Sequence, residues 1–123
     1  MSNPTNFGSG EYRLKAMHDA SYPGGVVVDP TPIASGEEIT VLYDGLLAAS
    51  GAERVYLHVG YGDSRDWRNI QVHHMSKTGW GWVKTLEMPD DTRFNFCFHD
   101  GHGNWDNNNG INWSFQIHNG RTH

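Results

Sequence analysis

The segment from Phe94 to Trp113 constrains the fold more than any other part of the chain. Three phenylalanines alternate with smaller or polar residues at its start, which is the two-residue period of a β-strand. Aromatic side chains repeated on one face of a strand need a hydrophobic core to cover them. Trp113, Phe115 and Ile117 restore the same period, so the segment predicts two strands joined by a long loop.

The loop between these two strands, Asp100 to Gly110, is almost entirely polar. Glycine and asparagine accept positive φ angles and form tight turns, so we expect a compact polar loop. Trp105 is the one side chain of this loop that could contribute to a core, yet its neighbours carry amide and carboxylate groups. Such an indole suits a sugar, because the apolar face of the sugar ring packs on it and amides bind the hydroxyls.

Short alternating or apolar runs, separated by turn residues, occupy most of the remaining chain. Within the run 69–75, the period places Ile70 and Val72 toward the core. Residues 11–18 fit either a strand or a helical turn, and residues 46–52 are predicted to be a link. Strands with turns about every 8 to 12 residues predict an all-β fold, an Ig-like antiparallel β-sandwich, with a small barrel as the alternative. The strands are predicted at 26–28, 38–43, 54–60, 69–75, 80–88, 92–99 and from Trp113 onward.

A length of 123 residues predicts a single domain, and the tail at residues 1–11, rich in Asn, Ser, Gly and Pro, is expected to be flexible. The domain is therefore expected to span residues 12–123. Cys97 is the sole cysteine, which excludes an internal disulfide. We expect it to be a small packed side chain on the strand face opposite the three phenylalanines, because no activating base accompanies it.

Charge and hydropathy exclude two classes of partner. The formal net charge is −5 and the nine Lys and Arg residues are scattered, which argues against nucleic-acid binding. No apolar run approaches about 18 residues, so no membrane span is expected. The start of the sequence lacks a basic region followed by an apolar stretch, which predicts a cytoplasmic protein.

Three aromatic residues are candidates for ligand binding because they fall outside the apolar pattern. Trp67 and Trp105 lie in polar loops, and an exposed tryptophan usually marks a binding site. His58 alternates out of phase with its core-type neighbours. The other tryptophans, Trp80, Trp82 and Trp113, lie on predicted strands and are interpreted as core residues.

Metal and enzyme sites find little support in the sequence. His58, His99 and His102, or the neighbours His73 and His74, could supply zinc ligands, but no HExxH motif or cysteine cluster accompanies them. The Asp and Asn residues of the 100–110 loop depart from the calcium-loop pattern, and Asx turns explain them more simply. A glycosidase needs two carboxylates flanking one bond, and the small predicted sandwich offers little cleft for them. We expect no cofactor and no catalytic residue.

Three segments, VYLHVGYGDSRDW, GWGWVKTLEMP and FNFCFHDGHGNWDNNNGINW, together resemble the starch-binding carbohydrate-binding modules of family 25 and the closely related family 53. The resemblance covers about residues 38–118 and is most specific where the strand ending in DG is followed by WDNN and then NW. It implies an Ig-like β-sandwich that binds α-1,4-glucans without cleaving them. It also implies six ligand-binding residues, which are His58, Trp67, Trp105, Asp106, Asn107 and Asn108.

By this resemblance, Trp67, Trp105 and His58 form an aromatic cradle for two adjacent glucose units. The implied ligands are starch, glycogen and maltooligosaccharides. Because most such modules are attached to amylases, a glucan-metabolising enzyme is the expected protein partner. Two other classes stay open from the residues alone, namely a small sandwich enzyme acting on sugars and an Ig-like protein-interaction domain.

Overall fold

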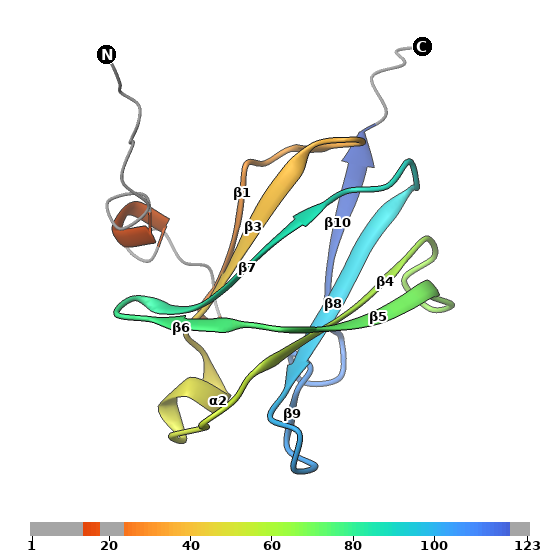
Figure 1. Cartoon of the computed structure of the whole chain (residues 1–123). Helices are drawn as coiled ribbons and strands as arrows, with labels where there is room; N and C mark the ends of the chain where they lie inside the picture. The colour runs from red at the N-terminus through yellow and green to blue at the C-terminus, as the bar shows by residue number, and fades with distance from the viewer. Residues whose placement is uncertain (1–13, 18–23, 119–123) are drawn as a thin grey trace, which may run out of the picture.

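The computed structural model describes residues 14–17 and 24–118, and the latter form two β-sheets packed face to face (Figure 1). The flexible tail predicted for residues 1–11 lies outside the described residues. No helix within the described ranges is long and apolar enough to cross a lipid bilayer. The elements are β1 (Val26–Asp29), β2 (Ile33–Ala34), β3 (Glu38–Tyr43), α2 (Leu46–Ala49), β4 (Tyr56–Tyr61), β5 (Arg68–His74), β6 (Ser76–Thr78), β7 (Gly81–Glu87), β8 (Arg93–His99), β9 (Trp105–Asp106) and β10 (Trp113–His118).

The strand order confirms the predicted Ig-like sandwich. The first sheet runs β1-β3-β7-β6, which is the A-B-E-D order of an immunoglobulin domain. The second runs β2-β10-β8-β4-β5, and its last four strands follow the G-F-C-C′ order. All neighbours pair antiparallel except β2 and β10, which are parallel. Between β5 and β6 the chain passes from the second sheet to the first at Met75, which is buried.

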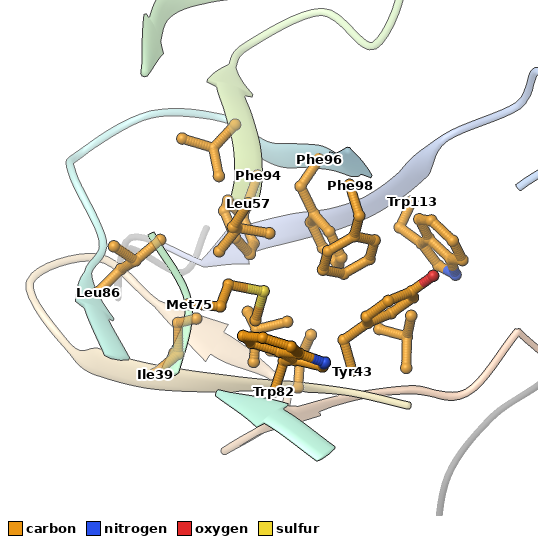
Figure 2. Packing of buried hydrophobic residues seen from close by; sticks show 14 of the residues in the cluster. Ile39, Tyr43, Leu57, Met75, Trp82, Leu86, Phe94, Phe96, Phe98 and Trp113 are labelled. Carbon is orange, nitrogen blue, oxygen red and sulfur yellow. The ribbon is translucent and has the colours of Figure 1, made fainter. Parts of the chain in front are cut away.

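The core lies between the two sheets and is rich in aromatic rings (Figure 2). Phe94, Phe96 and Phe98 of β8 are fully buried, as their alternation predicts. Trp113 is 8% exposed and its ring stacks on Phe96 at a centroid distance of 5.9 Å. Tyr43 of β3 stacks on Phe98 at 3.9 Å, so both sheets contribute rings to one cluster. The core assignment of Trp113 is therefore confirmed.

Trp82 is also buried, as predicted, but Trp80 is not a strand residue. Trp80 lies in the turn that precedes β7 and is only partly buried. The predicted link at residues 46–52 contains the short helix α2, which places Leu47 in the core. These differences leave the sandwich unchanged, and both concern one region of the surface, because Trp80 and Ala48 line the same pocket.

The prediction that Ile70 and Val72 point into the core is wrong, because they are 56% and 51% exposed. Val72 pairs with His58 across the sheet, and directly paired residues share a face, so Val72 lies on the outer face. β5 is the edge strand of its sheet. The two-residue period predicts the strand correctly, but the assignment of its two faces is exchanged, because periodicity alone does not say which face is covered.

Candidate functional site

The outer face of β4 presents a row of residues that do not enter the core. Leu57 and Val59 are fully buried, whereas His58 is only partly buried and points the other way. The Nδ1 atom of His58 is buried and has no hydrogen-bond partner among the described residues. Burial lowers the pKa of His58. Protonation would place a charged donor at an atom without an acceptor, so the imidazole is kept neutral near pH 7.

Trp67 reaches the same face from the turn that joins β4 to β5. A side chain at Gly60 would collide with Trp67, because a Cβ built there would lie 2.6 Å from the Trp67 Cβ. Glycine at position 60 therefore allows the indole to lie flat against the strand. The indole Nε1 donates a hydrogen bond of 2.9 Å to the carbonyl oxygen of Ser64, which fixes the ring orientation. The Trp67 and His58 ring centroids are 6.1 Å apart with an interplanar angle of 41°.

Trp105 reaches this face from the polar loop. The Asp100 carboxylate closes a turn by accepting bonds from the backbone nitrogens of His102 and Asn104 and from the Asn104 amide. The chain then folds back on β8, so that Trp105 in β9 pairs with His99. The sequence predicts a loop over residues 100–110, and the short strand β9 corrects that prediction. The indole is 48% exposed, a large fraction for tryptophan.

The three predicted aromatic residues meet on the outer face of β4 and β8, although they come from separate segments. The Trp105 ring lies 5.3 Å from that of His58 at 79°, and 4.4 Å from that of His99. The cluster also holds rings that sequence reasoning did not assign to it. We call the whole set the aromatic cluster, and its members are Tyr56, His58, Trp67, His74, His99 and Trp105.

The added rings follow from strand pairing. Tyr56 is opposite His99 on one side and His74 on the other, and it stacks on His99 at 5.0 Å. Tyr56 and His58 share a strand face by their spacing of two, which is a signal present in the sequence. Burial and the nearby His58 lower the pKa of His99, and Asp100 opposes that shift. The lowered pKa values of His58 and His99 favour the neutral form of both side chains.

Asp106, also predicted to bind ligand, points away from the aromatic cluster. Its Oδ2 atom accepts a hydrogen bond of 2.5 Å from the hydroxyl of Tyr43, the residue that stacks on Phe98. Burial and this bond raise the pKa of Tyr43, so the phenol stays protonated and donates. Adjacent residues of β9 point to opposite faces. Asp106 therefore anchors the strand to the core while Trp105 projects outward.

Asn107 and Asn108 hold the turn that leads to β10. The carbonyl oxygen of Asn107 accepts a bond of 2.7 Å from the nitrogen of Asn112, and its side-chain oxygen accepts one from Gly110. The Asn108 amide donates to the carbonyl oxygen of Asn112, and its φ of 56° is one that asparagine tolerates. None of these bonds reaches the aromatic cluster. A direct contact of either amide with ligand stays a prediction.

Cys97 lies beneath this surface on the outer face of β8, opposite His58. It is buried, and burial together with the charge of Asp106 raises the pKa of its thiol to about 11. A thiol of this kind is a poor nucleophile near pH 7. In the described parts of the chain, no group of three or more His, Cys, Asp or Glu side chains is placed to hold a metal ion.

Residues 39–96 resemble a known class of protein module. Residues 39–96 match the family model described as starch/carbohydrate-binding module (family 53). The matched segment includes His58 and Trp67 and ends before Trp105. The finding supports family 53 of the two related families named from the sequence, and the assignment to family 25 remains a prediction.

The chain is also similar to part of an enzyme. An alpha-amylase of Clostridium acetobutylicum is 39% identical to it over 88 residues, which are 70% of this chain and 11% of the amylase. The chain thus spans about a tenth of the length of that relative. No solved structure matches the chain. The matched segment is similar to a starch/carbohydrate-binding module, and the β-sandwich that contains it carries an exposed aromatic cluster suited to a sugar.

Proposed function

We propose that His58, Trp67 and Trp105 form a cradle that binds two adjacent glucose units of an α-1,4-glucan, whether starch, glycogen or a maltooligosaccharide. The observation that carries this proposal is the inclination of the rings, 41° between His58 and Trp67 and 79° between His58 and Trp105. An α-1,4-glucan coils, so its consecutive rings present their apolar faces at an angle. Rings fixed on separate segments of the chain can match that angle, which a flat row along one strand cannot.

We further propose that the module brings a glucan-metabolising enzyme to its polymer. The similar segment of the amylase is a small part of a much longer protein, which supports this arrangement. A shallow cradle immobilises little ligand surface, so affinity for one short chain is modest. Several such contacts on a polymer raise the overall affinity through avidity.

Retention on granular starch tests the proposed function, with cellulose as the control polymer. The module is expected to sediment with starch and to stay in solution with cellulose, because a flat β-1,4 chain does not fit inclined rings. Maltoheptaose incubated with the module is expected to keep its length. Equal retention on both polymers contradicts the proposed specificity. Shorter products indicate a sugar-acting enzyme, and absence of binding to any glucan indicates a protein-interaction domain.

Binding is expected to weaken in acid because His58 must stay neutral to lie against a sugar. Its pKa in the free module is already lowered by burial, and a covering ligand lowers it further. Affinity is therefore complete above the free-state pKa and is lost as the pH falls through it, below the usual value of about 6.5. The loss should reach about 1 kcal/mol, the net value of one neutral hydrogen bond.

Calorimetric titration with maltoheptaose at pH 8 and pH 5 measures this effect in the parent module and in His58→Gln. The variant has no titrating group at position 58, so its affinity should change less between the two pH values. A fall of equal size in both proteins would assign the titration to another group, with His99 next, since its pKa is also lowered. Equal affinity at both pH values in the parent would contradict the proposal for His58.

A further inference from the structure

We propose that the glucan chain continues past Trp105 into a second subsite, the groove between α2 and residues 100–104. This inference rests on the proposed function and extends it from two glucose units to a longer segment of the same chain. The groove encloses about 630 Å³, within the range of about 300 to 1,000 Å³ usual for small-molecule sites. Its lining includes Leu46, Glu53, Asp100 and Trp105.

Trp105 joins the groove to the cradle. Its ring contacts His58 and His99 in the aromatic cluster, and it also lines the groove. About half of the indole is exposed, so ring surface remains for more than one sugar contact. A glucan that stacks on Trp105 in the cradle therefore has its next units at the mouth of the groove.

The hydroxyl group of Tyr43 joins the two sides of this groove, α2 and the β9 strand that carries Trp105. The oxygen of Tyr43 accepts a hydrogen bond of 2.9 Å from the backbone nitrogen of Leu47 in α2. The same hydroxyl donates to Asp106 in β9, the residue next to Trp105. α2 and β9 are in contact, and both lie at the lower end of the sandwich in Figure 1. Because both walls are tied to one buried phenol, the groove is formed before any ligand arrives, which reduces the entropy cost of binding.

The side chains of the groove suit a neutral, hydroxyl-rich ligand with an apolar face. On the α2 side, Leu46 exposes its apolar side chain to solvent. Glu53 is exposed and its carboxylate makes no hydrogen bond or ion pair with the described residues, so both of its oxygens can accept from hydroxyls. On the loop side, Asp100 adds a second negative charge, which disfavours anionic ligands.

Chain-length dependence of affinity tests the second subsite. Calorimetry with maltotriose and maltoheptaose is applied to the parent module, to Glu53→Gln and to Leu46→Ala/Glu53→Gln. The substituted side chains are exposed, so the fold should persist, and a thermal melt checks it. The matched control is Glu38→Gln, an exposed carboxylate at the opposite end of β3 from α2. Maltoheptaose can bind a single site in more registers than maltotriose, so its affinity is higher even without a second subsite. The test is therefore whether the ratio of the two affinities differs between the parent and the variants.

We expect the double variant to bind maltotriose as the parent does and to bind maltoheptaose roughly tenfold more weakly, the effect of losing one hydrogen bond to a charged group and one apolar contact. Glu53→Gln should show part of this loss, and Glu38→Gln none. If the double variant binds maltoheptaose as tightly as the parent, the groove is not a subsite although the cradle stands. If the parent binds neither oligosaccharide, the proposed function itself fails and the subsite falls with it.

Discussion

Trp67→Ala and Trp105→Ala are each expected to weaken maltoheptaose binding by about 1 to 3 kcal/mol, and the double variant to abolish measurable binding. Each indole offers the cradle a large apolar face, and neither residue fills the core between the sheets. Calorimetry gives the affinities, and a thermal melt tests whether the fold persists. We expect melting temperatures close to that of the parent, because both residues lie at the surface.

Trp80→Ala is the matched control for these variants. It removes the same ring from a turn next to β7, which belongs to the other sheet. Its glucan affinity should equal that of the parent. Parent-like affinity in both Trp67→Ala and Trp105→Ala would reject the cradle. A collapsed melting transition would also reject it, because it would show that these rings support the fold.

Trp113→Ala is expected to have the largest effect on stability, a loss of about 3 to 5 kcal/mol in the free energy of unfolding. The ring packs against Phe96 and Phe98 at centroid distances of 5.9 and 5.3 Å, and it is almost completely buried. Truncation leaves a cavity that neighbouring aromatic rings cannot fill without leaving their rotamers. Urea denaturation measures the change as a lower midpoint with an unchanged slope.

Ile111→Ala provides the control for Trp113→Ala. Ile111 lies two residues earlier in the chain and is exposed, so its truncation should change stability by less than about 0.5 kcal/mol. If Trp113→Ala unfolds at the same urea concentration as the parent, then Trp113 does not belong to the core in solution. The register of β10 against β8 would then be wrong as well.

The alternation in β4 and β8 predicts correctly which residues of these two strands fill the core. In both strands one face is fully apolar, so the pattern has only one reading. β5 shows why the same pattern failed elsewhere. Ile70 and Val72 alternate as core residues do, but the strand is at an edge and exposes its apolar side. Periodicity identifies two faces of a strand without stating which of them is covered.

The candidate binding residues can be found in the sequence to the extent that they break the apolar pattern. Trp67 and Trp105 stand out as aromatic residues in polar turns, and the structure brings both to His58. The bond between Asp106 and Tyr43 was not predictable, since it joins residues 63 positions apart and depends on how α2 and β9 meet. His99 and His74 entered the cluster through strand pairing, which no local pattern contains.

The Asp100 turn has a consequence for the heat of binding. Three hydrogen bonds to its carboxylate hold the loop closed before Trp105, so the loop needs no folding when a glucan arrives. A binding segment that folds on its ligand shows a large negative heat-capacity change, because much more surface than the contact itself leaves water. In this module the heat-capacity change should be small, because only the contacting surfaces of the sugar and the indoles leave water. The binding enthalpy should therefore change little with temperature.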